Sequence, residues 1–368
     1  MNLQTKITIA APDFSIDYNS KLMMLGSCFA ENMGGKFSYY KFDVDVNPCG
    51  IIYNPLSVAN VLRLIMEGKP FGKDDLRKVG EKWVSLYHHG AFSSTDPEEC
   101  LRRINERLER ATRELRSLDL LVITWGTAWV YKHMGENMIV SNCHKIPSQE
   151  FERSRLSVED IVKEYVELIE RLREINPGLR VLFTVSPIRH WKDGAHGNQL
   201  SKATLLLAID QLREKLDHVY YFPAYEIVLD ELRDYRFYAD DMLHMSGLTV
   251  DYIWERFLYS FITPDVLGLM NQIGRINKGV AHRPFDPQSE DYQRLVKKML
   301  AEIAMISHSY PMINFSAEEE KLKSLEFKIL NLEFRMKELP PPAPPLHRGR
   351  DERKKASRCF NVVYPPPV

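Results

Sequence analysis

The feature that most constrains this chain is a short apolar run that stops at a glycine–serine pair and is followed at once by a helical pattern. The run covers residues 22–25, the pair is Gly26-Ser27, and the predicted helix covers residues 28–39. Glycine lets the backbone turn sharply between the two elements. A serine on such a strand-to-helix turn is where many hydrolases carry a nucleophile, although serine is also a common helix N-cap.

The same strand-then-helix order recurs along the chain. Continuous apolar runs predict strands at residues 118–125 and 179–185, and helical patterns follow at residues 157–176 and 200–216. Such alternation is typical of parallel β-α units with helices on both faces of one sheet. We therefore predict an α/β fold, a three-layer α/β/α sandwich with a mainly parallel sheet, plus C-terminal helices.

Functional sites in such sheets lie at the carboxyl ends of the strands. Four small or polar residues follow predicted strand ends, and they are Ser27, Gly50, Gly126 and Ser186. We expect these four segments to meet at one edge of the sheet.

A histidine late in the chain follows an aspartate by three residues, in Asp240-Asp241-Met242-Leu243-His244. A histidine can take the proton of a nucleophilic serine, and an aspartate fixes the histidine tautomer and stabilises the imidazolium. The order Ser27, Asp241, His244 therefore predicts a catalytic triad. Asp240 stands one residue off and stays open as the orienting group, and the pattern alone also fits a turn with an exposed histidine.

Composition excludes several classes of function. The chain has 368 residues with 49 basic and 50 acidic side chains, a net charge of -1. This net charge gives no overall electrostatic attraction to nucleic acid or to an anionic membrane. No apolar run approaches the ~20 residues of a membrane helix, and the first twenty residues lack a signal-peptide pattern. The five dispersed cysteines are typical of reduced thiols. We expect a cytoplasmic protein with neither nucleic-acid nor membrane partners.

Three regions follow from the change of pattern along the chain. Residues 1–262 carry the strand-helix alternation, residues 263–339 are predicted to form a helical extension, and residues 340–368 form a proline-rich basic tail. An amphipathic helix predicted at residues 316–339 either packs on its own domain or supports self-association. The tail cannot build a packed core, and we expect it to be disordered.

The motif Gly26-Ser27-Cys28-Phe29-Ala30 resembles the sequence for which the GSCFA domain family is named, a branch of the SGNH/GDSL-like hydrolases. The likeness covers about residues 20–260. Further segments that resemble the family are Asn47-Pro48-Cys49-Gly50-Ile51-Ile52-Tyr53-Asn54-Pro55, Thr124-Trp125-Gly126-Thr127-Ala128-Trp129, Asn142-Cys143-His144-Lys145-Ile146-Pro147, Ser186-Pro187-Ile188-Arg189, Ser201-Lys202 and residues 234–244.

The resemblance implies a serine esterase that cleaves an O-acyl ester through an acyl-enzyme and needs no cofactor. It also suggests a small-molecule or carbohydrate ester as substrate. Two positions depart from the family pattern. Met245 follows the late histidine where proline is usual, and Gly126-Thr127-Ala128-Trp129 stands where SGNH enzymes carry Gly-x-Asn-Asp. A catalytically silent binding or interaction protein with the same fold is therefore the alternative.

The second departure removes the usual oxyanion asparagine. We expect the oxyanion hole to use the backbone N–H groups of Ser27 and Gly50. Asn142 is the predicted side-chain donor, with Thr127 second, although Asn142 fits a loop-capping role equally well.

Other side chains are predicted to line the cleft as substrate-binding residues, and they are Thr127, Trp129, His144 and Arg189. Core packing is the competing interpretation for the tryptophans. Cys28 is the rival nucleophile, because a thiol at a helix start can have a lowered pKa, but we expect its side chain to point into the core. The polar stretch 194–198 is predicted to be a lid or a plain loop.

No metal site is predicted. The adjacent pair His88-His89 would point to opposite faces of a strand, and no cysteine or carboxylate cluster stands beside it in the sequence.

Overall fold

The centre of the fold is a five-stranded parallel sheet. The computed structural model describes residues 4–286 and 289–325. The strand order is β10-β9-β5-β1-β2, and every neighbouring pair in it is parallel. The strands are β1 (Lys21–Gly26), β2 (Asp43–Val46), β5 (Leu120–Trp125), β9 (Arg180–Val185) and β10 (Val219–Tyr221). The predicted parallel sheet is confirmed.

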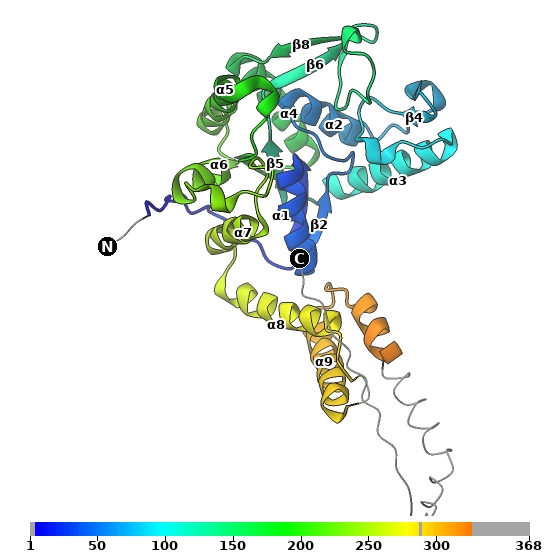
Figure 1. Cartoon of the computed structure of the whole chain (residues 1–368), viewed down its shortest axis with the longest axis vertical. Helices are drawn as coiled ribbons and strands as arrows, with labels where there is room; N and C mark the ends of the chain where they lie inside the picture. Colours follow the sequence, from blue (N-terminus) through cyan, green and yellow to red (C-terminus); the bar gives the residue numbers. More distant parts are fainter. Residues whose placement is uncertain (1–3, 287–288, 326–368) are drawn as a thin grey trace, which may run out of the picture. The chain divides into compact units, whose positions relative to one another are not determined.

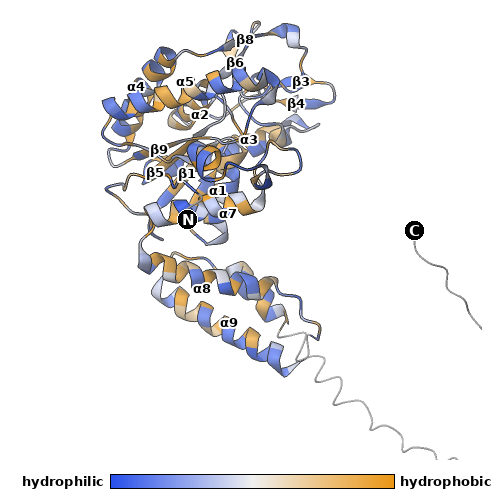
Figure 2. Cartoon of the chain, turned by 60° about the vertical axis from the view of Figure 1, so that its left-hand side comes forward, coloured by the Kyte–Doolittle hydropathy of each residue, from blue (hydrophilic) through white to orange (hydrophobic). Residues whose placement is uncertain are grey.

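Helices cover both faces of this sheet (Figures 1 and 2). One layer contains α2 (Pro55–Glu67), α3 (Pro97–Leu115), α4 (Val158–Ile175) and α5 (Gly194–Lys215), and the other contains α1 (Cys28–Tyr39) and α7 (Gly247–Phe261). Because strand side chains alternate between faces, Met23 and Leu25 of β1 join the core shared with α2 to α5. The three-layer sandwich is confirmed.

The second core, between α1 and α7, is aromatic. The Phe37 ring lies edge-on to Trp254 and Phe257, with centroids 4.8 and 5.6 Å apart. This packing anchors the C-terminal half of α1 against α7, and Ser27 is the N-cap at the other end of the helix.

A small antiparallel sheet follows β5 in the chain. Its order is β7-β6-β8, formed by β6 (Trp129–His133), β7 (Met138–Ile139) and β8 (Phe151–Arg155). A separate hairpin joins β3 (Arg77–Val79) to β4 (Lys82–Val84). Residues of β6 and β8 reach the carboxyl edge of the central sheet, where they contribute to the cleft described below.

The stretch 194–198 is neither a lid nor a loop, and that prediction is wrong. These residues form the first turn of α5. A contact with the preceding segment contributes: the Asn198 side-chain oxygen accepts a hydrogen bond of 3.0 Å from the His190 N–H. That bond fixes the turn to the segment after β9, which a local sequence pattern does not reveal.

Helices follow the sandwich towards the C-terminus. They are α8 (Pro264–Ala281), α9 (Glu290–Ser309) and a helix over residues 316–325. Glu318 of the last helix forms an ion pair of 2.6 Å with Lys41, just after α1. The described residues up to 322 belong to one compact unit, and the boundary at residue 262 stays a prediction. The predicted tail, 340–368, lies outside the described residues.

Candidate active site

The turn between β1 and α1 requires a glycine. Gly26 has φ of +137°, and a Cβ placed there would lie 2.1 Å from the Thr124 carbonyl oxygen of β5. The Gly26 N–H donates to the Asn47 side-chain oxygen over 2.9 Å, and its carbonyl accepts from the Ile52 N–H over 2.9 Å. The turn is therefore held by β5 on one side and by the segment after β2 on the other.

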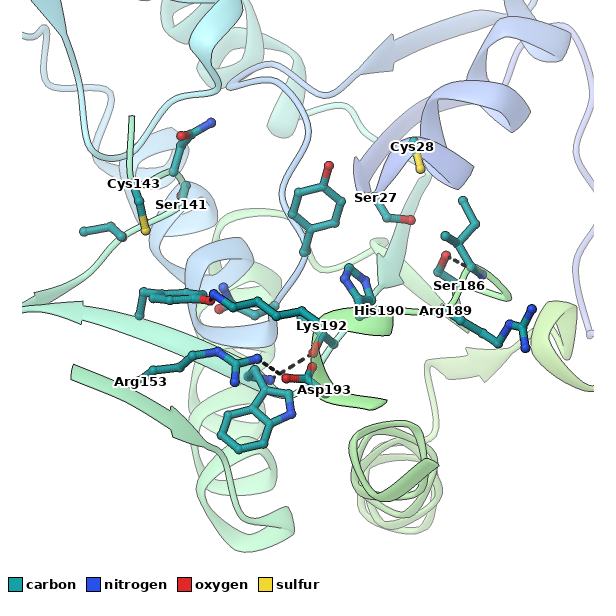
Figure 3. Close-up of a pocket in the computed structure, with 18 of the residues that line it drawn as sticks. Ser27, Cys28, Ser141, Cys143, Arg153, Ser186, Arg189, His190, Lys192 and Asp193 are labelled. Carbon is teal, nitrogen blue, oxygen red and sulfur yellow. Dashed lines mark hydrogen bonds and ion pairs between the residues drawn. The ribbon is translucent and has the colours of Figure 1, made fainter. Parts of the chain in front are cut away.

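Ser27 comes next and is the N-cap of α1. Its hydroxyl oxygen accepts a hydrogen bond of 3.3 Å from the Phe29 N–H. The side chain is almost fully buried, with 1% exposed, yet it lines a cleft with a volume of about 420 Å³. Figure 3 shows Ser27 within this cleft. The residue predicted as nucleophile thus stands on a rigid turn at the positive end of a helix dipole.

The structure brings Asp241 and His244 together. One Asp241 oxygen lies 2.5 Å from His244 Nδ1, and the other accepts from the N–H groups of Leu243 and His244, each over 2.9 Å. Hydrogen bonds from His244 lower the pKa of Asp241 to about 2. Asp241, and not Asp240, is therefore the carboxylate in contact with the histidine.

His244 and Ser27 line the same cleft without a hydrogen bond between them. The side chains of His244 and Asp241 are 55% and 47% exposed, in contrast to the buried serine. A further hydrogen bond of this loop comes from Arg189, which donates to the Met242 carbonyl oxygen over 2.5 Å. Arg189 also lines the cleft.

Two of the three predicted oxyanion donors, the N–H groups of Ser27 and Gly50, already donate to backbone carbonyls. The Ser27 N–H donates to the Thr124 carbonyl over 3.3 Å, and the Gly50 N–H donates to the Asn47 carbonyl over 2.7 Å. Asn142 lines the cleft, but its side-chain oxygen caps the backbone by accepting from the His144 N–H over 2.8 Å. Its neighbours in the sequence, Ser141 and Cys143, lie across the cleft from Ser27 in Figure 3.

Thr127 and Trp129, which were predicted to bind substrate, both line the cleft. The Thr127 hydroxyl is 3.1 Å from the Ser201 hydroxyl, which also accepts from the Ala128 N–H over 2.8 Å. The Arg153 guanidinium covers the Trp129 ring, 4.1 Å from its centroid. The other tryptophan of this segment, Trp125, is fully buried in the core.

His144 is absent from the residues that line the cleft. Its Nε2 lies 2.8 Å from the Ser85 carbonyl oxygen instead. Residues 144 and 145 both have positive φ, +48° and +62°, and this left-handed pair turns the chain after Asn142. The structure therefore places His144 against the 85–88 loop rather than in the cleft where we expected it.

Cys28 does not point into the core, contrary to the prediction. Its side chain is half-buried and lines the same cleft as Ser27, as Figure 3 shows. Burial raises the pKa of the Cys28 thiol, which keeps it protonated and weakens it as a nucleophile.

His190 is a cleft residue that the sequence analysis did not single out. A Cβ added to Gly126 would lie 3.0 Å from His190 Nε2, so glycine at the end of β5 makes room for this ring. Burial, together with the charge of Lys202, lowers the pKa of His190 to about 4. A neutral imidazole with one N–H donor therefore faces the cleft at neutral pH.

Lys202 is a second residue near the cleft that the sequence analysis did not single out as a site residue. It is 1% exposed, and its ammonium donates to the carbonyl oxygens of Gly126 and Ser186, each over 2.6 Å. These carbonyls follow β5 and β9. Burial lowers the pKa of Lys202 to about 7. The sequence signal was the Ser201-Lys202 pair, although nothing local in it predicts burial.

A parallel sheet between two helical layers, with a serine capping the helix after its first strand, defines a three-layer α/β protein. The chain belongs to the GSCFA family. The model of that family matches residues 21–257, and the model described as the GSCFA domain protein, C-terminal domain, matches residues 273–325. No curated protein matches the sequence.

Three of the solved structures that partly resemble this chain are esterases. An acetyl xylan esterase from Butyrivibrio proteoclasticus shares 12% identity and a TM-score of 0.35, covering 70% of this chain and 65% of that one. A carbohydrate esterase of family three from Talaromyces cellulolyticus shares 11% identity and a TM-score of 0.31, with coverages of 68% and 98%. A carbohydrate esterase of family two from Clostridium thermocellum shares 14% identity and a TM-score of 0.30, with coverages of 72% and 67%. The family assignment rests on the sequence match.

Two further findings concern other kinds of site. Among residues 4–286 and 289–325, no three His, Cys, Asp or Glu side chains are grouped so that they could hold a metal ion. Over the same residues, no helix has both the length and the apolar character needed to cross a membrane.

Proposed function

We propose that this protein is a serine hydrolase that cleaves an O-acyl ester. The observation that carries the proposal is the position of Ser27, on a strand-to-helix turn and in one cleft with His244, which is bound to Asp241. A buried hydroxyl at a helix N-terminus and an imidazole held by a carboxylate are the two parts that nucleophilic acyl transfer needs. Membership of the GSCFA family supports this interpretation.

The proposed reaction has two halves. His244 accepts the Ser27 proton as the hydroxyl oxygen attacks the ester carbonyl, and then gives that proton to the departing alcohol. Water, activated by the same histidine, hydrolyses the acyl-enzyme and restores Ser27. Asp241 holds His244 Nδ1–H and stabilises the imidazolium. The Ser27–His244 contact is expected to form with substrate bound, because catalytic hydrogen bonds often tighten only in the complex.

We assign the side-chain oxyanion donor to His190 in preference to Asn142. His190 lies against Gly126. Gly126 belongs to the segment after β5 in which the buried Ala128 offers no polar group. Within the described residues, neither His190 ring nitrogen has a hydrogen-bond partner, so its N–H is free to meet a developing negative charge. Its lowered pKa of about 4 keeps the ring neutral, and a neutral imidazole can donate one hydrogen bond without a competing charge.

A covalent serine probe tests the proposed function directly. We expect a fluorophosphonate to label the folded protein at Ser27, identified by mass spectrometry of the labelled peptide, and Ser27→Ala to lose the label. Ser186→Ala is the matched control, because Ser186 is another buried serine that lines this cleft, and it should still be labelled at Ser27. Absence of label on a folded wild-type protein would reject the hydrolase.

The second candidate is a catalytically silent binding protein. It is favoured by the engaged N–H groups of Ser27 and Gly50 and by the missing contact between Ser27 and His244. The probe separates the two candidates, because a silent protein with this fold would stay unlabelled and still bind its ligand in the cleft.

A further inference from the structure

The side chains that line the cleft carry an excess of positive charge. Three of them are basic, Arg153, Arg189 and Lys192, and Asp193 is the one carboxylate among the described residues that line it. Asp193 has a side chain only 3% exposed and forms an ion pair with Arg153, drawn in Figure 3. Arg189 and Lys192 therefore leave an excess of two positive charges in the cleft.

Lys192 is the more accessible of these two cations. Its ammonium donates to the Tyr131 hydroxyl over 2.7 Å, an uncharged partner that leaves the charge uncompensated. Arg189, by contrast, is tied to the Met242 carbonyl and lies towards the other side of the view in Figure 3. Lys192, Arg153 and Tyr131 thus form a distinct group, which we call the cationic subsite.

The two cations of this subsite contact its aromatic side chains differently. Arg153 lies over one face of the Trp129 ring, 4.1 Å from its centroid, and this cation–π contact helps to hold the guanidinium in place. Lys192, bonded to the Tyr131 hydroxyl, lies at the hydroxyl edge of that ring, 5.1 Å from its centroid. The subsite therefore offers a ligand positive charge and N–H donors.

We propose that the cationic subsite binds an anionic group, a carboxylate or a phosphate, on the alcohol part of the ester that Ser27 cleaves. The inference rests on the proposed function for its reaction, and names the substrate class of that site. Lys192 supplies the charge that meets the anion, and Arg153, fixed between Asp193 and Trp129, supplies directed donors beside it. Wild-type enzyme should prefer acidic over neutral acyl esters.

The test compares esters that differ only in the anionic group. We would measure kcat/KM on O-acetylated glucuronic acid, O-acetylated glucose 6-phosphate and O-acetylated glucose with wild type, Lys192→Met and Lys192→Arg. We expect Lys192→Met to lower the ratio of acidic to neutral kcat/KM roughly 10-fold, the scale of one lost charge-assisted hydrogen bond, and Lys192→Arg to restore most of it. Lys132→Met, on the same strand as Tyr131 but outside the cleft, should leave the ratio unchanged.

The two acidic esters separate the two possible sources of the anion. A preference for the uronic ester alone assigns a carboxylate, and a preference for the phosphorylated ester alone assigns a phosphate. Equal kcat/KM on all three esters, or a ratio that Lys192→Met does not change, would overturn the subsite while leaving the hydrolase in place. If wild type hydrolyses no ester, the proposed function fails, and the subsite is then judged by calorimetric binding of glucuronate and glucose 6-phosphate. Binding of neither, or binding that Lys192→Met leaves unaltered, would overturn it.

Discussion

Ser27 and the Asp241–His244 pair of the candidate triad are held in place in different ways. Ser27 lies on a buried turn whose glycine bonds to segments far away in the sequence, at Asn47 and Ile52. The Asp241–His244 pair lies on an exposed loop, and its hydrogen bonds run mainly within four residues. The proposed nucleophile is therefore held by contacts across the fold, whereas the proposed base is held by local hydrogen bonds and by one from Arg189.

This contrast teaches where changes should affect activity and where they should affect stability. A buried turn held by long-range contacts is part of the core, so its backbone cannot change without destabilising the fold. An exposed loop with local bonds contributes little to the free energy of unfolding. Substitutions in the loop should therefore alter catalysis alone, which the following predictions exploit.

The largest expected effect is on Ser27. Ser27→Ala should lower ester turnover by roughly 10⁴-fold or more, because the nucleophile is lost, and should leave the melting temperature nearly unchanged. Turnover of 4-nitrophenyl acetate with thermal unfolding of the same samples measures both. Cys28→Ala is the matched comparison: if it abolished turnover while Ser27→Ala kept it, the nucleophile would be the cysteine.

Asp241 should give the next largest effect. Asp241→Asn keeps an oxygen for the backbone N–H groups but presents an amide to His244 Nδ1, which favours the wrong tautomer and should lower kcat roughly 10³–10⁴-fold. Asp240→Asn serves as control, since the hydrogen bonds of His244 in this loop go to Asp241 and not to Asp240, and should stay near wild type. Steady-state kinetics of the two variants would refute the assignment if their losses were equal.

The third prediction concerns His190, the proposed oxyanion donor that lines the cleft. His190→Phe keeps the ring but removes the N–H donor, and should lower kcat roughly 10²–10³-fold with little change in KM. His196→Phe, an exposed histidine on the first turn of α5, is the control. The same assay on Asn142→Ala tests the donor predicted from sequence. A loss of roughly 3 kcal/mol in transition-state stabilisation there, with His190→Phe near wild type, would return the role to Asn142.

The smallest effect concerns the pH dependence of stability. Burial lowers the pKa of Lys202 from 10.5 to about 7, so between these values the unfolded chain holds the proton that the folded chain has released. Stability should therefore rise with pH in this window, by up to about 1.4 kcal/mol per unit, and the full cost of burying the charge applies below about pH 7. Urea unfolding at pH 7, 8 and 9 should show this slope in wild type relative to Lys202→Met. Parallel pH profiles for the two proteins would contradict a buried, shifted lysine.

The sheet, the first helix and the Asp241–His244 contact were predictable because their signals are local. Apolar runs mark the strands, the N-cap marks the helix, and an aspartate three residues before a histidine can reach it within one turn. His190, Lys192 and Lys202 were not predictable as site residues, because tertiary packing alone brings the end of β9 and the start of α5 to the cleft. The left-handed backbone at residues 144–145 likewise turned His144 away without a sequence signal.

The bonds of Lys202 have a mechanical consequence. One ammonium joins the carbonyls that follow β5 and β9, and these two segments carry Thr127 on one side and His190 on the other. A displacement of either segment would strain a buried hydrogen bond that water cannot replace. We therefore expect these two segments to move as one, and the movement that the proposed Ser27–His244 contact requires to come from the exposed loop that carries His244.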